Sequence, residues 1–290
     1  MKKLLITGAS GFLGWHLCQE AQRQGWHVHG TRHTHPVQIS GVVLHTLDLT
    51  DVQALKGVLN DVNPDAVIHC AARARPNDCQ VDPEGSYGIN VTASINLATL
   101  CRDRAIAYTF ISTEQVFDGL NAPYHESDPV SPINIYGEQK VAAEQGILVQ
   151  QPTALICRMP LLFGVAPTAP SFLQGLLQKL RSGDQINLFV DEFRTPVSGC
   201  DAAKGILLAL NQTQGLLHLG GVERLSRYAF GQKLVAAVGT DESCLHPGHQ
   251  ADLKFSAPRA PDLTLDSARA LTMGYAPDNV TDALKKLTLT

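Results

Sequence analysis

Three residues of this 290-residue chain have the types and spacing needed for proton transfer to a carbonyl oxygen. Tyr136 and Lys140 are four residues apart, so on a helix they share one face and the ammonium lies near the phenol. A phenol with a pKa of about 10 exchanges protons poorly at neutral pH, and a nearby cation lowers that pKa. Thr113 adds a hydroxyl that fixes the substrate carbonyl. We therefore predict that Thr113, Tyr136 and Lys140 are the catalytic residues.

The elements that position these residues begin at the N-terminus, where a short apolar run is followed by a glycine turn and a helix. Gly8, Gly11 and Gly14 lie three residues apart, just before the helix expected at residues 15–24. Glycines in such a turn permit unusual backbone angles, close approach to a pyrophosphate and tight helix packing. The helix N-terminus offers free N–H groups and a positive dipole end to phosphate. This pattern predicts a dinucleotide site formed by Gly8, Ser10, Gly11, Phe12, Leu13 and Gly14.

The end of the second expected strand, residues 26–30, indicates which dinucleotide binds. A carboxylate there accepts the ribose hydroxyls of NAD, whereas an arginine accommodates the 2′-phosphate of NADP. This chain has Arg32 at that end and no acidic residue. We therefore predict NADP (NADPH) as the cofactor, with NAD as the alternative, and Arg32 as a cofactor-binding residue.

Strands and helices alternate through the first half of the chain, which argues for an α/β fold with a doubly wound parallel sheet (Rossmann). We expect further strands at 42–49, 66–72, 107–112 and 154–157, and a returning strand at 216–219. A dinucleotide crosses the carboxyl ends of such strands. The carboxyl ends of these strands therefore predict further cofactor-binding residues, which are Asp48, Leu49, Cys70, Ala71, Ala72 and Pro160. The helix that carries Tyr136 and Lys140 adds these two residues to the predicted cofactor site.

Beyond residue 164 the alternation loosens, which predicts a smaller, interleaved C-terminal substrate domain. Short helices are expected from Phe172, Asp201, Ser226 and Asp266, each beginning at or after its capping residue. We assign residues 1–164, 201–221 and 276–290 to the NADP-binding Rossmann domain. Residues 165–200 and 222–275 are assigned to the substrate-binding domain.

Composition argues against several other classes of function. The net charge of −4 gives no basic footprint for a nucleic acid, and no apolar stretch is long enough to span a bilayer. The seven cysteines stand singly, which suits reduced thiols in a cytoplasmic protein. No metal site is expected, because the histidine group at 27, 29, 33 and 35 lacks partners at ligand spacing and suits a solvated strand end. A homodimer is left open.

Taken together, these motifs resemble the extended short-chain dehydrogenase/reductase family. The likeness is carried by Thr7–Gly14, His69–Ala72, Ser112–Thr113, Val116–Gly119 and Tyr136–Lys140. More narrowly, Phe110–Gly119, Pro123–Asp128 and Pro132–Lys140 resemble the dTDP-4-dehydrorhamnose reductase group. The resemblance implies a Rossmann domain, NAD(P)H and a sugar nucleotide with a 4-keto group. It also places the family's Thr, Tyr and Lys positions on Thr113, Tyr136 and Lys140.

Four residues are predicted to contact the substrate, namely Thr113, Asn77, Arg194 and Arg259. Arg194 lies in a segment, residues 191–196, that resembles a substrate-loop motif of the family. Asn77 lies in a loop where this chain replaces the group's usual acidic stretch, and Leu161 stands where that group usually has tryptophan. Arg259 follows an irregular segment and offers a guanidinium to a diphosphate.

The expected function is an NADPH-dependent reductase that transfers a hydride to the 4-keto group of a nucleotide-linked sugar. A dehydratase needs an acid pair directly after the threonine, but Glu114 is followed by Gln115. Arg32 favours a cofactor that enters and leaves as NADPH, which disfavours an epimerase. The alternative from another class is an NADP-binding regulatory subunit without turnover, like the regulatory subunit of methionine adenosyltransferase. The presence of Thr113, Tyr136 and Lys140 argues against it.

Overall fold

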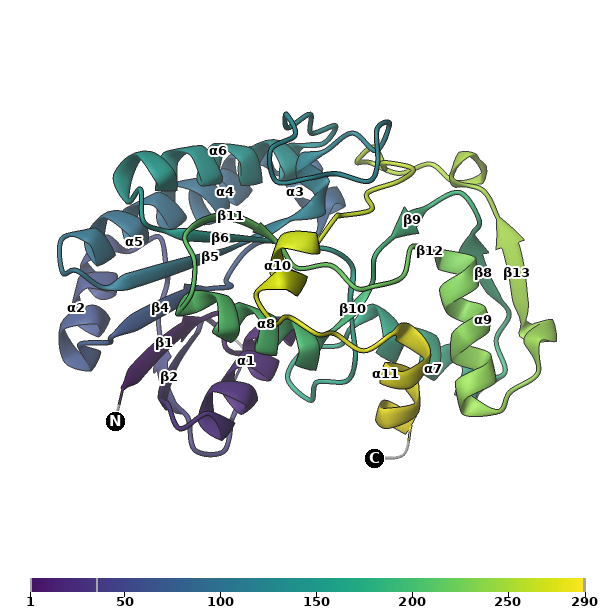
Figure 1. The fold of residues 1–290 in the computed structure, drawn as a ribbon, viewed down its shortest axis with the longest axis horizontal. Coiled ribbons are helices and arrows are strands. Elements are labelled where there is room, and N and C mark those ends of the chain that lie inside the picture. Colours follow the sequence, from purple (N-terminus) through teal and green to yellow (C-terminus); the bar gives the residue numbers. More distant parts are fainter. Residues whose placement is uncertain (1, 35, 289–290) are drawn as a thin grey trace.

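A computed structural model of the chain describes residues 2–34 and 36–288. Its centre is a seven-stranded parallel sheet with the order β11-β6-β5-β4-β1-β2-β3 (Figure 1). This order is the Rossmann arrangement extended by β11 at one edge, which confirms the predicted doubly wound fold. The strands are β1 (Lys3–Thr7), β2 (His27–Arg32), β3 (Val43–Thr46), β4 (Ala66–His69), β5 (Ala107–Thr113), β6 (Leu155–Met159) and β11 (Gly215–His218).

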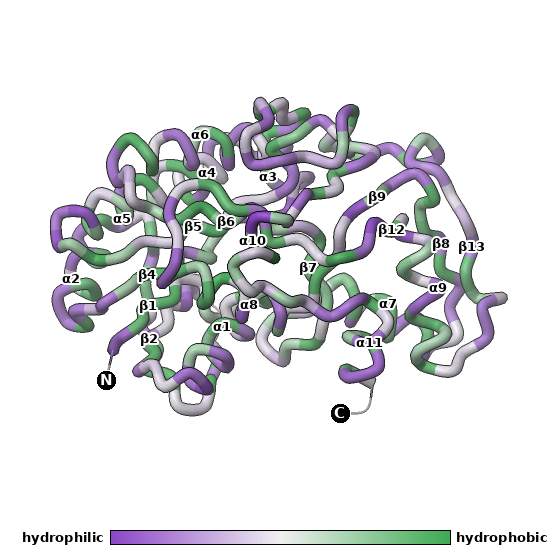
Figure 2. The backbone as a smooth tube through the Cα atoms, viewed as in Figure 1, coloured by the Kyte–Doolittle hydropathy of each residue, from purple (hydrophilic) through white to green (hydrophobic). Residues whose placement is uncertain are grey.

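Helices cover both faces of this sheet because successive side chains of each strand point to opposite sides. In β1, Leu4 and Ile6 pack in one apolar cluster with α1 and α8, whereas Leu5 packs with α2, α5 and α6 on the other face. Figure 2 shows the hydrophobic strands enclosed between these layers. The α-helices of the chain are α1 (Phe12–Arg23), α2 (Val52–Val62), α3 (Pro76–Val81), α4 (Pro83–Tyr87), α5 (Ala93–Arg102), α6 (Ile135–Gln150), α7 (Phe172–Ser182), α8 (Gly199–Leu210), α9 (Arg227–Val238), α10 (Ala268–Thr272) and α11 (Val280–Thr288).

Several element boundaries differ from the sequence-based expectation. Helix α1 begins at Phe12, because Gly11 has extended backbone angles and is the N-cap, so Gly14 lies inside the helix. Strands β3 and β4 end at Thr46 and His69, so the expected nucleotide contacts at 48–49 and 70–72 lie in the loops beyond. The helix expected at 87–104 is interrupted by a π-helical turn at Gly88–Thr92.

Two predicted helix caps are also displaced by one to three residues. Ser198, rather than Asp201, caps α8, because its hydroxyl accepts the backbone N–H of Asp201. Ser267 is the N-cap of α10, and the preceding Asp266 accepts the N–H of Ala268. Ser226 caps α9 as expected. Short 3-10 turns at Glu114–Val116, Glu242–Cys244 and Gln250–Asp252 complete the helical elements.

The C-terminal part forms a smaller unit beside the sheet (Figure 1). Three two-stranded ladders join β7 (Leu162–Phe163) to β10 (Val197–Ser198), β8 (Ile186–Phe189) to β13 (Leu245–Gly248), and β9 (Phe193–Arg194) to β12 (Leu225–Ser226). Its apolar core joins α7, α9 and the strand β8, and α11 contributes Val280, Ala283 and Leu284 to this core. Helix α11, which we assigned to the Rossmann domain, thus packs on the smaller unit, while the division into two domains stays a prediction.

Candidate active site

The glycine turn after β1 has the geometry that the sequence pattern requires. Gly8 has a φ of +69°, and a Cβ there would lie 2.8 Å from the backbone N and Cα of Ala71. A Cβ on Gly14 would lie 2.1 Å from the carbonyl oxygen of Gly8, so only glycine lets α1 pack this closely. Gly11 caps α1 without a side-chain hydrogen bond, which leaves the first N–H groups of the helix to a ligand. The turn therefore fits a phosphate group at the helix N-terminus.

A cavity of about 560 Å³ opens beside this turn at the carboxyl ends of β1, β2 and β4. It collects most of the predicted cofactor residues, which are Gly8, Ser10, Gly11, Arg32, Asp48, Leu49, Cys70, Ala71 and Ala72. The predicted Phe12, Leu13 and Gly14 do not line it, because they form the first turn of α1 behind the glycine loop. Sequence reasoning missed the other lining residues, Thr31, His33, Leu47, Thr50, Arg73, Gly85 and Ile89.

Arg32 stands at the end of β2, where it lines this cavity. Its Nε is buried without a hydrogen-bond partner among the described residues, which is costly for a cation and fits a site completed by an anion. Asp48, in the loop after β3, lines the same cavity, and the hydroxyl and N–H of Thr50 hold the pKa of that carboxyl below its usual value. The guanidinium of Arg32 fits the phosphorylated ribose of an NADP molecule better than the free hydroxyls of NAD.

Two of the three predicted catalytic residues lie at a second cavity, of about 540 Å³, between the sheet and the smaller unit. Thr113 at the end of β5, Tyr136 in the first turn of α6 and the predicted cofactor residue Pro160 after β6 all line it. Three predicted substrate residues, Asn77, Arg194 and Arg259, line the same cavity. Residues from distant parts of the chain are thus brought to one reaction chamber.

Lys140 lies beneath this chamber and lines neither cavity. Its Nζ donates a hydrogen bond to the carbonyl oxygen of Ile111 at 2.8 Å and lies 5.9 Å from the centre of the Tyr136 ring. Burial lowers the pKa of the Lys140 ammonium to about 8, although the carboxylate of Glu144 opposes that shift. The predicted proximity of ammonium and phenol is therefore present.

The expected direction of the Tyr136 pKa is wrong. Burial raises the pKa of the phenol above its ordinary value, and a hydrogen bond with Thr113 lowers it only in part. Desolvation disfavours the phenolate because the residue is only 6% exposed. The phenol is consequently protonated at neutral pH, which suits a proton donor.

The position of Tyr136 is set by the N-terminus of α6. Asn134 caps this helix, its side-chain carbonyl accepting the N–H of Gly137 at 2.9 Å while its amide donates to the carbonyl of Pro258. A Cβ on Gly137 would lie 2.2 Å from the carbonyl oxygen of Gln115, so glycine permits the first turn to rest on the segment after Thr113. The cap and this close contact hold phenol and threonine together.

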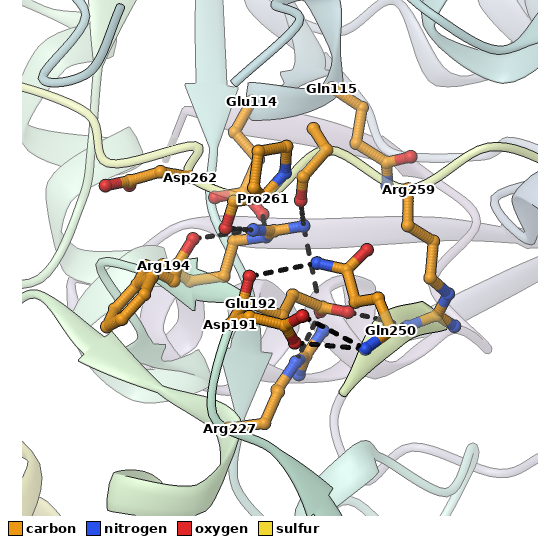
Figure 3. A network of polar contacts seen from close by, with 12 residues as sticks. Glu114, Gln115, Asp191, Glu192, Arg194, Arg227, Gln250, Arg259, Pro261 and Asp262 are labelled. Carbon is orange, nitrogen blue, oxygen red and sulfur yellow. Dashed lines mark hydrogen bonds and ion pairs between the residues drawn. The ribbon is translucent and has the colours of Figure 1, made fainter. Parts of the chain in front are cut away.

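The lining of the reaction chamber also includes a group of charged residues that sequence reasoning largely missed (Figure 3). Glu114 and Glu192 are both almost fully buried, and each forms ion pairs with arginines. Burial raises the pKa of Glu114 to about 8, opposed by Arg194. Burial also acts on Glu192, but the surrounding arginines hold the pKa of this carboxyl below its usual value. No sequence spacing links Glu114 to Glu192 or to Arg227, so only the folded chain shows this cluster.

The prediction of a solvated strand end holds for His27 and His33, which are exposed, but it is wrong for His29. His29 is buried in β2, where its Nδ1 lies 3.1 Å from the Nε2 of His45, and burial is the main cause that lowers its pKa to about 4. His35 lies outside the described residues. Within residues 2–34 and 36–288 no group of three metal-binding side chains occurs, and no helix there is long and apolar enough to cross a membrane.

The glycine turn, the strand order and the Thr, Tyr and Lys arrangement define an NAD(P)-dependent oxidoreductase of the extended short-chain dehydrogenase/reductase type. The chain belongs to the RmlD substrate binding domain family, which matches residues 1–289. This membership confirms the predicted family and enzyme class.

The chain is similar to relatives of two different kinds. The chain is 31% identical over 266 residues to a probable low-salt glycan biosynthesis reductase, Agl14, of Haloferax volcanii, covering 90% of this chain and 88% of the relative. It is 29% identical over 283 residues to methionine adenosyltransferase 2 subunit beta of Rattus norvegicus, covering 94% of this chain and 83% of that one. The family therefore includes both a reductase and a protein named as a subunit of another enzyme.

Solved structures share the whole fold. A dTDP-4-dehydrorhamnose reductase of Clostridium acetobutylicum superimposes with a TM-score of 0.86 at 26% identity, covering 98% of both chains. The dTDP-4-dehydrorhamnose reductase of Bacillus anthracis, solved in complex with NADP, gives a TM-score of 0.88 at 21% identity, covering 100% of this chain and 99% of that one. The second likeness concerns the fold alone.

Proposed function

We propose that this protein is an NADPH-dependent reductase that delivers a hydride to the 4-keto carbon of a nucleotide-linked sugar. The observation that carries the proposal is the meeting of Thr113 and Tyr136 in one cavity above the buried Lys140. The reductase names of the Haloferax and Clostridium relatives support the reaction class. The nucleotide-linked substrate follows the printed name of the Clostridium enzyme.

The roles of the three residues follow from their surroundings. The reduced nicotinamide supplies the hydride when bound, and the phenol of Tyr136 gives its proton to the carbonyl oxygen as negative charge develops there. Thr113 holds that oxygen by a hydrogen bond from its hydroxyl. The ammonium of Lys140, 5.9 Å from the centre of the Tyr136 ring, would stabilise the phenolate that remains and would hold the nicotinamide ribose. The raised pKa of Tyr136 keeps the proton available until it is needed.

NADP is the proposed cofactor because Arg32 offers an unpartnered buried nitrogen at the ribose end of the nucleotide cavity. The NADP complex of the Bacillus structure agrees with this assignment. Eight further predicted contacts line the same cavity, namely Gly8, Ser10, Gly11, Asp48, Leu49, Cys70, Ala71 and Ala72. NAD is the alternative cofactor.

Turnover is tested by following NADPH oxidation with a panel of nucleotide-linked 4-keto sugars. Replacing Tyr136 by Phe removes only the hydroxyl, and we expect turnover to fall about 10²- to 10⁴-fold, the usual contribution of a positioned proton donor. NADPH binding should be retained. Tyr87→Phe is the matched control, since this phenol is 49% exposed and lies outside both cavities. Unchanged turnover in Tyr136→Phe would refute the mechanism.

A second candidate is a cofactor-binding regulatory subunit without turnover, favoured by the 29% identity to methionine adenosyltransferase 2 subunit beta. The same panel separates the two proposals. Tight NADPH binding without oxidation on any 4-keto sugar would favour the regulatory protein. An epimerase of the same superfamily is a further alternative, and it would interconvert sugars without net NADPH consumption.

A further inference from the structure

A further cavity, here called the rear cavity, lies at the edge of the sheet opposite the reaction chamber. It has a volume of about 860 Å³ and is lined by the first residues of β5 and β6 and by the segment before β11. Small-molecule sites commonly occupy about 300–1,000 Å³. Thr109 lines the rear cavity, whereas Thr113 lines the reaction chamber four residues later, roughly 13 Å along an extended strand. The rear cavity is therefore separate from the site of the proposed reaction.

Two buried polar atoms of the rear cavity have no partner. Thr109 is 0% exposed and Gln151 is 5% exposed, and neither the Oγ1 of the first nor the Oε1 of the second forms a hydrogen bond within residues 2–34 and 36–288. The amide nitrogen of Gln151 donates to the carbonyl of Ile106, another lining residue, at 3.0 Å, which fixes this amide at the cavity wall. An unpaired buried polar atom is costly, so both positions call for a hydrogen bond from outside the chain.

The ends of three helices argue against an anionic ligand. The rear cavity is lined by Arg102, the last residue of α5, by Gln151, the C-cap of α6, and by Leu210, the last residue of α8. The free carbonyl groups at a helix C-terminus carry partial negative charge. Together with the unpaired carbonyl oxygen of the Gln151 side chain, these helix ends disfavour a phosphate or a carboxylate.

The lining also argues against a cation and against an apolar ligand. Among the described lining residues none carries a carboxylate, and Arg102 is the only charged one. Its guanidinium is held by the carboxylate of Asp103 at 2.8 Å and by the side-chain oxygen of Gln150 at 3.0 Å. An apolar ligand would leave Thr109 and Gln151 unpaired. The class that remains is a neutral ligand that both donates and accepts hydrogen bonds.

We propose that the rear cavity binds a neutral polyhydroxyl compound, namely a free sugar. A sugar hydroxyl can donate to the Oε1 of Gln151, and another can exchange hydrogen bonds with the hydroxyl of Thr109. Amides and hydroxyls are the neutral groups that pair with sugar hydroxyls, and the rear cavity has such side chains at Thr109, Gln151, Thr153, Asn211, Gln212 and Gln214. This site does not depend on the proposed reductase function, because it lies outside the reaction chamber.

The test is saturation-transfer NMR of glucose and maltose with the full-length protein, in the presence of excess NADPH and dTDP to occupy the other two cavities. We expect at least one sugar to receive saturation from the wild-type protein. Ala107, the exposed first residue of β5, lines the rear cavity, and the indole of Ala107→Trp should fill it and abolish the signal. Val43→Trp is the matched control, because Val43 is the exposed first residue of β3 and lines none of the three cavities. NADPH binding should be unchanged in both variants.

A second variant covers the case in which Ala107→Trp fails to fold. Thr109→Val keeps the shape of the side chain and removes only its unpaired hydroxyl, so sugar affinity should fall about three- to tenfold, the effect of one hydrogen bond. The urea midpoint of Thr109→Val should be no lower than that of the wild type, because the missing hydroxyl has no internal partner in the part of the chain described. Thr240→Val, at an exposed position outside the rear cavity, should bind sugar as the wild type does.

Three outcomes would overturn the inference. Sugar signals that are absent from the wild type, or that persist in Ala107→Trp, would show that the rear cavity is not a sugar site. Signals that appear only without NADPH and dTDP would locate the sugar in another cavity. A lower urea midpoint of Thr109→Val would show that its hydroxyl has a partner inside the protein. Because sugar binding is measured without turnover, each of these outcomes leaves the reductase proposal intact.

Discussion

The ammonium of Lys140 is bonded to the carbonyl oxygen of Ile111 at 2.8 Å, two residues before Thr113. The lysine is only 3% exposed and also lies over the ring of Phe110, 4.4 Å from its centre. Because α6 and β5 are joined by this contact, the proposed catalytic residues of the two elements are held in one arrangement. The pH dependence of the reaction should follow from the burial of this ammonium.

Burial lowers the pKa of Lys140 to about 8, so the free protein loses this charge as the pH rises past that value. The phenol of Tyr136 stays protonated over the same range, because its pKa is raised. We therefore expect kcat/KM, which reports the free enzyme, to fall above about pH 8, approaching tenfold per pH unit. An arginine at this position stays charged, so the residual kcat/KM of Lys140→Arg should not fall above about pH 8. A wild-type profile that is flat to about pH 10 would contradict the assignment.

Arg32 should determine the preference of the protein for NADPH over NADH. Arg32→Gln removes the guanidinium that faces the predicted 2′-phosphate, and we expect KM for NADPH to rise about tenfold or more, by loss of a charge-assisted hydrogen bond. KM for NADH should change little, because that molecule has no phosphate there. Arg23→Gln, at the other end of α1, is the control, since its guanidinium pairs with Glu20 outside the nucleotide cavity. Equal effects on both cofactors would show that Arg32 acts only on stability.

The buried pair of Arg158 and Glu144 should stabilise the sheet near the active site. Two hydrogen bonds, of 3.1 and 2.7 Å, join these side chains, which are 2% and 5% exposed. Glu144→Gln leaves a buried guanidinium without its counter-charge, and we expect a loss of about 3–5 kcal/mol in the free energy of unfolding. Urea denaturation measures this loss. Glu138→Gln, on the exposed face of α6, should change the free energy by less than about 0.5 kcal/mol. A loss below about 1 kcal/mol in Glu144→Gln would mean that the guanidinium finds other partners.

Two buried histidines should make the protein less stable in acid. Burial lowers the pKa of His69 to about 3, assisted by Lys140, and burial lowers that of His16 to about 4. The unfolded chain takes up these protons near its ordinary histidine pKa of about 6.5, whereas the native protein does not. Stability is therefore fully present above about pH 6.5 and falls below it, by up to about 1.4 kcal/mol per pH unit for each group.

His16 allows this prediction to be tested directly, because its Nε2 has no hydrogen-bond partner in the described part of the chain. Between about pH 7 and pH 5, His16→Gln should lose about 2 kcal/mol less unfolding free energy than the wild type. The exposed His246 provides the control, and His246→Gln should follow the wild-type curve. Identical curves for His16→Gln and the wild type would show that His16 does not titrate as its burial implies.

Local chemistry explains why much of the site is readable from the sequence. A positive φ at Gly8 and a close contact at Gly14 are backbone requirements that only glycine meets, so the turn is visible as a spacing pattern. The four-residue step from Tyr136 to Lys140 is likewise a property of one helix. The strand and helix alternation follows from hydrophobic periodicity, and the strand ends then locate Arg32 and Ala71 in the nucleotide cavity. These features together determined the fold class and the family, and they carry the prediction of the catalytic residues.

The tertiary structure decided what depends on burial and on contacts between distant segments. Desolvation, which no spacing reveals, raises the pKa of Tyr136 where the sequence predicted a lowering. Arg194 was predicted to contact substrate, but its nitrogens are occupied by Glu114 and by the carbonyls of Phe193 and Ala260. Arg227 becomes part of the chamber only because α9 begins against Glu192. Side-chain types and their local spacing are features of the sequence. The ion-pair partner of each charged group depends instead on how the β9 strand, the α9 helix and the loop before Pro261 pack together.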